Sequence, residues 1–213
     1  MRRARLAILA AFGLLTVTLG AACSSSGSTA GPSGTTSAIA VGSTTVPTGA
    51  ANPNTSEVNP AGDIPDEQVF VTYAPPSGLF RVDVPEGWAR TEDNGAVTFA
   101  DTLNSIRLET VPADSAPTLA SVKANEVGAI ESAATNYEAG TIESVSRRSG
   151  DAVRITYRAD SRPDPVTGKV IRLDVERYEF FKNGTEAILT LSGPQGADNV
   201  DPWRIVTDSF VWA

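Results

Sequence analysis

The amino-acid sequence predicts an α+β domain, an antiparallel β-sheet flanked by helices, that follows a signal peptide and a flexible tether. Three observations lead to this prediction. The chain opens with a cationic and then apolar segment that ends at its single cysteine. An uncharged stretch rich in Ser, Thr, Gly and Pro comes next, and short runs of alternating apolar and polar residues fill most of the remainder. Such alternation is typical of strands with one buried face.

The first 22 residues have the parts of a bacterial lipoprotein signal peptide. Three arginines within the first five residues precede an uncharged, mostly apolar run, and small residues then lead to Cys23. We expect cleavage before Cys23 and attachment of lipid to its thiol. Gly20 departs from the usual lipoprotein pattern, which has leucine at this place. The alternative is an uncleaved anchor, for which the apolar run is short, since a spanning helix needs about 20 strongly apolar residues.

Residues 23–67 are expected to form a lipidated, flexible tether. The part from Ser24 to Ser56 contains no charged residue and no periodic apolar pattern. A segment of this composition buries too little apolar surface to offset the entropy that ordering costs. With the acidic stretch that follows, up to Glu67, the tether has about 40 residues, and a flexible coil of that length spans roughly 35 Å.

The domain is predicted to begin at Gln68 with four strands. They cover residues 69–73, 79–84, 96–101 and 105–111. In the second strand, Phe80 and Val82 alternate with charged residues, as expected for a strand with one face in the core. Turn clusters rich in Pro and Gly separate the first strands, at Ala74–Gly78 and Pro85–Trp88.

One long helical pattern occupies the middle of the domain, over residues 118–135. Its apolar residues recur near one face, as in an amphipathic helix: Leu119, Val122, Val127, Ile130 and Ala134. Ser115 or Thr118 is expected to cap the N-terminus of this helix, and Pro117 suits its first turn.

Strands resume after the helix, over residues 137–148, 152–158 and 170–181. Asn183-Gly184 then forms the strongest two-residue hairpin signal in the chain, and a turn there pairs Phe180 with Ala187. In the strand before the turn, apolar residues recur at odd positions up to Val175 and at even positions from Tyr178, so they move to the other face of the strand near Arg177. Two alternatives explain this change: a bulge near Arg177, or a strand with both faces covered.

A C-terminal helix is predicted after a loop over residues 193–201. Asp201 is expected to be its N-cap and Pro202 its first residue. Its packed side is expected to carry Ile205, Val206 and Phe210. All these elements belong to one domain, residues 68–213, which is long enough to bury most of its apolar surface.

Composition argues against several classes of function. The 17 basic residues fall to 14 when the signal with its three arginines is removed, against 25 acidic residues, so the mature chain carries a formal charge of −11. Such a charge opposes binding to nucleic acid. The chain has no histidine, and lipidation would consume the only cysteine. The commonest general base and metal ligand is therefore missing, and no free thiol remains.

We accordingly predict no catalytic residue, no cofactor and no metal site. Asp198, Asn199 and Asp201 carry oxygens suited to Ca²⁺, but turn and helix-cap roles explain them more simply. The three tryptophans could line an apolar pocket, although core packing is the simpler role: Trp88, Trp203 and Trp212.

Two segments carry a resemblance to a known group of proteins. The segment FVTYAPPSGLFRVDVPEGW resembles the opening hairpin of the PsbP-like families, and FFKNGTEAILTLSGP with DPWRIVTDSFVW resembles their closing hairpin and terminal helix. The group includes photosystem II PsbP, the Ran-binding Mog proteins and bacterial lipoproteins of DcrB and LpqN type. The Ala, Thr and Arg bias resembles that of an actinobacterial protein. The resemblance implies an antiparallel sheet flanked by helices, and it implies no activity or site residue.

Three functions are weighed from the sequence. We favour a non-catalytic cell-envelope lipoprotein, held on the extracytoplasmic face of the membrane by its lipid, whose domain binds a protein or assists assembly of a complex. The second is a carrier of a small molecule in an apolar cleft. The third is a hydrolase without histidine, which would need two convergent carboxylates in a cleft. Contacts are expected through three loops: Pro75–Gly78, Asp160–Gly168 and Gly193–Asp201.

Overall fold

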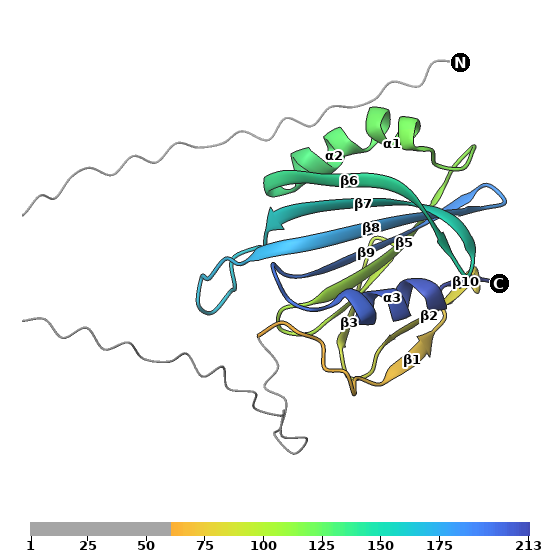
Figure 1. Cartoon of the computed structure of the whole chain (residues 1–213). Helices are drawn as coiled ribbons and strands as arrows, with labels where there is room; N and C mark the ends of the chain where they lie inside the picture. The colour runs from red at the N-terminus through yellow and green to blue at the C-terminus, as the bar shows by residue number, and fades with distance from the viewer. Residues whose placement is uncertain (1–60) are drawn as a thin grey trace, which may run out of the picture. The chain divides into compact units, whose positions relative to one another are not determined.

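The computed structural model describes residues 61–213 (Figure 1). Cys23, the predicted signal peptide and the predicted tether up to residue 60 lie outside the described residues. The described part is an α+β fold with two antiparallel sheets and three helices, as the sequence predicts. No helix in residues 61–213 is long and apolar enough to cross a membrane.

The larger sheet has seven strands in the order β3-β4-β5-β9-β8-β7-β6, and each neighbouring pair is antiparallel. Its strands are β3 (Ala89–Asp93), β4 (Ala96–Ala100), β5 (Ser105–Pro112), β6 (Thr135–Arg147), β7 (Gly150–Asp160), β8 (Arg172–Lys182) and β9 (Thr185–Pro194). The smaller sheet has the order β1-β2-β10, with β1 (Phe70–Tyr73), β2 (Phe80–Pro85) and β10 (Val211–Trp212).

The two faces of the larger sheet are covered by different elements (Figure 1). The helix α3 (Val200–Ser209) and the smaller sheet cover one face, and the main core lies there, with Phe80, Tyr178, Phe180 and Phe210 almost fully buried. The helices α1 (Leu119–Asn125) and α2 (Val127–Ala133) lie along β6 and cover the other face. We call these the α3 face and the helix face.

The predicted hairpin at Asn183-Gly184 is confirmed. Both residues have positive φ, at 50° and 79°, as a type I′ turn requires, and Phe180 is paired with Ala187. The register of β8 with both neighbours is unbroken, so no bulge occurs near Arg177. The apolar residues of β8 move from one face of the strand to the other near Arg177 because both faces are covered, as in the second of the two alternatives.

The single helix predicted over residues 118–135 is wrong, because the chain forms two helices of seven residues each. The interruption falls at Glu126, which caps the end of α1 and the start of α2 and whose φ of −113° departs from the usual helical value. Thr118 is the N-cap of α1, as predicted, and it forms a capping box with Ser121. Leu119 was expected on the packed face, yet its side chain is 39% exposed, and only Val122 in this helix is buried.

The predicted start of the C-terminal helix is also corrected. Asn199, and not Asp201, is the N-cap of α3, and the side chain of Asn199 makes no capping bond. That side chain instead donates to the carbonyl of Gly62 and accepts from the backbone N–H of Ile64. Val206 and Phe210 are buried as expected, whereas Ile205 is 47% exposed, because the buried side follows the helical spacing of Trp203, Val206 and Thr207.

Residues 62–67, which the sequence analysis assigns to the tether, begin to pack on the domain. Ile64 is 4% exposed and belongs to the main core. Its backbone N–H donates to Asn199 at 2.8 Å, and the carbonyl of Gly62 accepts from both Asn199 and Asn104 at 3.0 Å. Contacts with the domain therefore start before residue 68.

Candidate functional site

A cleft opens on the helix face, between α2 and the sheet. Its volume is about 550 Å³, within the range of small-molecule sites. One wall consists of helix residues that include Ala129, Ile130 and Ala133, and the floor includes Val175 from β8. Charged residues line one part of it: Arg107, Glu109, Glu126 and Arg177. We call this space the helix cleft. It has an apolar part and a charged part.

The helix cleft exists because α1 and α2 cover the sheet with very few buried side chains. Only Val122 of α1 is buried, against Val153 and Ile155 of β7, and α2 buries no residue fully. Val127 and Ile130 are partly buried at the rim of this small cluster. Because few contacts hold this layer, it can move at a lower free-energy cost than α3, which packs on the main core.

Arg177 lies at the centre of the charged part. Its side chain stands on the helix face of β8 and is only 16% exposed. The guanidinium donates from Nε to Oε1 of Glu179 at 2.7 Å and from Nη2 to Oε2 of Glu126 at 3.1 Å. Glu109 of β5 lies 3.8 Å from the third nitrogen and also faces Arg107. One guanidinium thus connects β8, β5 and the junction of the two helices.

Two of the nearby carboxylates are buried. Glu179 is fully buried and Glu186 of β9 is 8% exposed. Burial raises the pKa of Glu179 to about 8, with a further rise from the neighbouring carboxyl group of Glu126, although Arg177 acts in the opposite direction. Burial, and then the charge of Glu126, also raises the pKa of Glu186 above its ordinary value. Both groups therefore favour their neutral forms more than exposed glutamates do.

This arrangement does not resemble the carboxylate pair of a glycoside hydrolase. Such a pair must flank a bound substrate, with one carboxyl group on each side of the reacting bond. Glu126 lines the helix cleft, but Glu179 and Glu186 do not, and Glu179 has no exposed surface. The chemistry of the cleft is therefore better suited to binding an apolar or charged group than to general acid–base catalysis.

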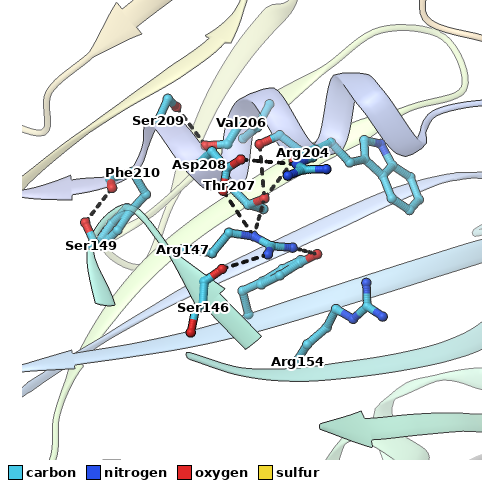
Figure 2. A network of polar contacts seen from close by, with 12 residues as sticks. Ser146, Arg147, Ser149, Arg154, Arg204, Val206, Thr207, Asp208, Ser209 and Phe210 are labelled. Carbon is cyan, nitrogen blue, oxygen red and sulfur yellow. Dashed lines mark hydrogen bonds and ion pairs between the residues drawn. The ribbon is translucent and has the colours of Figure 1, made fainter. Parts of the chain in front are cut away.

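The α3 face is held together by a polar network around Arg147 (Figure 2). The Arg147 guanidinium donates to the Thr207 hydroxyl at 3.1 Å and to the Tyr178 hydroxyl at 3.0 Å, and it lies 3.6 Å from Asp208. Ser149 donates to the carbonyl of Phe210, at the end of α3. These bonds join β6 and β8 to α3, so they fix the helix rather than form an open site.

A smaller cavity of about 370 Å³ lies on the α3 face near the start of α3. Trp203 and Asn199 form part of its wall, and charged residues from three strands, β6, β7 and β8, also line it. Those charges are already paired, because Arg158 binds Asp174 at 2.8 Å and Glu138 at 3.1 Å. A ligand here would have to compete with these ion pairs.

A third region is formed by loops at one end of the larger sheet. The connection between β7 and β8, residues 161–171, projects from the sheet (Figure 1). It borders a groove of about 530 Å³ whose other wall is residues 100–105. Aliphatic side chains are exposed on this connection and at the start of α3: Val166 at 90%, Val170 at 45% and Val200 at 72%. We call this region, residues 161–171 and 195–200, the loop surface.

The structure brings together two of the three loops predicted to make contacts. The loops Asp160–Gly168 and Gly193–Asp201 both leave the same end of β8 and β9, because Gln195 N–H donates to the carbonyl of Arg172. The loop Pro75–Gly78 instead borders a cavity of about 430 Å³ beside Asn94 and Gly95, at the start of β4, whereas the loop surface adjoins the end of β4. It therefore belongs to a different surface.

The remaining predicted site residues have other places. Cys23 lies outside the described residues. Trp203 is buried in the main core, and Trp88 and Trp212 pack against it. Of the possible Ca²⁺ ligands Asp198, Asn199 and Asp201, Asn199 is buried and holds Gly62 through its amide.

The charged residues of the helix cleft were missed by sequence reasoning. The sequence does contain a signal for two of them. Arg177 and Glu179 alternate in step with the apolar Leu173 and Val175, so all four side chains lie on the same face of a strand that is covered on both faces. Charged residues in such positions are buried and must be paired. Their neighbours on β5, on β9 and at the junction of α1 and α2 are distant in sequence, so no local pattern identifies them.

Comparison with known proteins supports the fold. No family model matches the sequence, and neither does any curated protein. The solved structure of the cyanobacterial PsbP protein (CyanoP) of Synechocystis sp. PCC 6803 matches with a TM-score of 0.52 at 16% identity, over 73% of this chain and 100% of that one. The chain is thus similar to PsbP in fold.

Two further structures are similar at lower TM-scores. The Saccharomyces cerevisiae Ran-binding protein Mog1p matches with a TM-score of 0.47 at 10% identity, over 68% of this chain and 95% of that one. A protein from Bacteroides thetaiotaomicron VPI-5482 matches with a TM-score of 0.45 at 10% identity, over 67% of this chain. This chain spans about half of the latter protein, 48% of its length. The fold is therefore PsbP-like, as the match to the cyanobacterial protein shows.

Proposed function

We propose that this protein is a cell-envelope lipoprotein, anchored through Cys23 on the extracytoplasmic face of the membrane, whose PsbP-like domain is a non-catalytic module that binds a protein partner. The N-terminal sequence supports the anchor and the location. The fold supports a binding role only by analogy, since one fold serves many functions.

The observation that carries the protein-binding role is the loop surface. It presents three exposed aliphatic side chains, Val166, Val170 and Val200. Val166 and Val170 belong to the connection whose neighbouring residues line a groove of about 530 Å³, and Val166, at 90% exposure, contributes almost nothing to packing within the domain. Exposed apolar side chains on loops that a rigid sheet carries are typical of protein-interaction sites.

Site-specific photocrosslinking tests this role in the intact envelope. A photoreactive amino acid placed at Val166, and separately at Val200, should give the same crosslinked partner. The matched control is Val111, which is 37% exposed at the far end of β5 and should give no such product. Products of equal yield from all three positions, or different products from Val166 and Val200, would argue against one partner bound at the loop surface.

The anchor is tested separately, by replacement of the acceptor thiol. The Cys23→Ser variant has no thiol to acylate, so it should incorporate no labelled fatty acid and should either stay uncleaved or leave the membrane fraction. Incorporation of label at the level of the unmodified chain would contradict the lipoprotein assignment without affecting the binding role of the domain.

A second candidate function, carriage of a small ligand, is favoured by the helix cleft. Its volume of about 550 Å³ and its apolar part suit a small amphipathic molecule. The Ala133→Trp variant would fill part of this space from α2. A ligand that copurifies with the unmodified chain, and is lost from this variant but retained when Val166 is replaced by Asp, would favour the carrier over the protein-binding module.

A further inference from the structure

The charged part of the helix face has more carboxylates than cations. Four carboxylates meet two guanidinium groups there: Glu109, Glu126, Glu179 and Glu186 with Arg107 and Arg177. Two of these carboxylates are buried. A buried carboxylate that lacks a compensating charge is costly, so the excess must be neutralised by protons or by a bound cation.

Arg177 neutralises only one side of this cluster. It binds Oε1 of Glu179 and Oε2 of Glu126. The other oxygen of Glu179, Oε2, is buried without a hydrogen-bond partner among the described residues, and so is Oε1 of Glu186. Glu186, whose side chain is more than nine-tenths buried, therefore has an unpartnered oxygen and belongs to the same cluster of carboxylates.

The carboxylate oxygens converge closely enough for one ion. One oxygen from each of Glu126, Glu179 and Glu186 lies within 4.8 Å of the other two. Oxygens on opposite sides of a Ca²⁺ ion are about 4.6–5.2 Å apart, because each lies 2.3–2.6 Å from the metal. We propose that these three glutamates bind a divalent cation of the size of Ca²⁺. This inference does not depend on the proposed function.

The same residues indicate which ion would bind and by which route it would reach the site. All three ligands are carboxylates, which suit hard cations such as Ca²⁺, and residues 61–213 contain no histidine or cysteine that would favour zinc. Glu126 lines the helix cleft, so the ion and its remaining water ligands reach the site through the cleft. The nearby charge of Arg177 weakens binding, and we expect a dissociation constant of about 10⁻⁴–10⁻³ M, as in other weak Ca²⁺ sites.

The test measures thermal unfolding of the purified, chelator-treated full chain at pH 8, with Ca²⁺ as the probe. About 10 mM Ca²⁺ should raise the midpoint temperature by roughly 3–8 °C, as expected when the ligand exceeds its dissociation constant tenfold or more. The Glu186→Gln variant keeps the shape of the side chain but lacks the charge, so it should lose most of this rise. The control Glu131→Gln removes an exposed carboxylate of α2 and should keep the full rise.

Two results would overturn the proposal. No rise at pH 8 in the unmodified chain, together with no terbium luminescence sensitised at the cluster, would mean that protons alone neutralise it. An undiminished rise in Glu186→Gln would place the ion elsewhere on the acidic surface. If Glu186→Gln does not fold, Glu126→Gln decides between these results, because Glu126 is on the partly exposed cover of the site.

Discussion

Glu179 is an ionisable side chain with no exposure to solvent. It is fully buried on the helix face of β8, and among residues 61–213 its one ion-pair partner is Arg177. Burial outweighs the attraction of that guanidinium and raises the pKa of Glu179 from an ordinary value of 4.5 to about 8. In the folded protein this carboxyl group therefore holds a proton under conditions where the unfolded chain releases it.

This difference predicts how stability depends on pH. Between about pH 4.5 and 8 the folded state binds more protons at Glu179 than the unfolded state, so this contribution to the free energy of unfolding is complete below pH 4.5 and is lost as the pH rises to 8. The Glu179→Gln variant has no such proton. Its free energy of unfolding, measured by urea denaturation with a chelator present, should fall less steeply with pH, by up to about 1.4 kcal/mol per pH unit.

The comparison needs a control for the general effect of removing an acid. The Glu131→Gln variant removes an exposed carboxylate and should follow the pH dependence of the unmodified chain. Parallel curves for the unmodified chain and Glu179→Gln would show that Glu179 is ionised in the folded protein, and that Arg177 alone compensates its charge.

The individual residues of the candidate site could be predicted from the sequence only in part. Arg177 and Glu179 alternate in phase with apolar residues, and this pattern identifies them as buried once both faces of β8 are known to be covered. Glu126 lies at the junction of α1 and α2, and Glu186 comes from β9. No residue spacing in the sequence places these groups beside Arg177 and Glu179, since the tertiary fold alone sets their distance.

At the scale of elements, turn chemistry predicts more than apolar patterning does. The Asn183-Gly184 signal correctly predicts the β8–β9 hairpin and its register. The same dipeptide at Asn94-Gly95, also with positive φ at both residues, joins β3 to β4. The strand β3 was missed because all five of its residues are exposed at the edge of the sheet, so it has no apolar alternation. The turn signal would have identified it.

The β8–β9 hairpin gives a prediction at this scale. Gly184 has a φ of +79°, which a β-branched residue adopts only with strain. The Gly184→Val variant should lower the free energy of unfolding by about 1–3 kcal/mol. The control Asn183→Gly should change it by much less, because glycine adopts the φ of 50° found there without strain. Equal, small effects in urea denaturation would mean that the turn relaxes to another loop conformation.

At the scale of the whole molecule, the two faces of the larger sheet are packed differently. The α3 face contains the main core and the Arg147 network, which hold α3 on β6 and β8 (Figure 2). The helix face has one small apolar cluster, a charged centre and a cleft. The fold class was predictable because alternation and turns are local. The split of the helix at Glu126 was not predictable from the sequence. It occurs where Glu126 contacts Arg177, which belongs to a strand that is distant in sequence.

The limits of the domain provide the last prediction. The sequence places its start at residue 68, but Ile64 is in the main core and Asn199 and Asn104 both bind Gly62. A chain that begins at residue 68 loses the burial of Ile64, worth about 1.5–3 kcal/mol. It also leaves two buried amide side chains short of partners, at about 1–3 kcal/mol for each unsatisfied group.

We therefore expect a chain that begins at residue 68 to be less stable than one that begins at residue 57 by about 3.5–9 kcal/mol in urea denaturation. The control is deletion of residues 24–56 from the full chain. It keeps Gly62 and Ile64, and its composition predicts no packing on the domain, so the midpoint should hardly change. Equal stability of the chains that begin at 57 and 68 would show that the Gly62–Ile64 contacts contribute little, and that the folded domain begins at residue 68 after all.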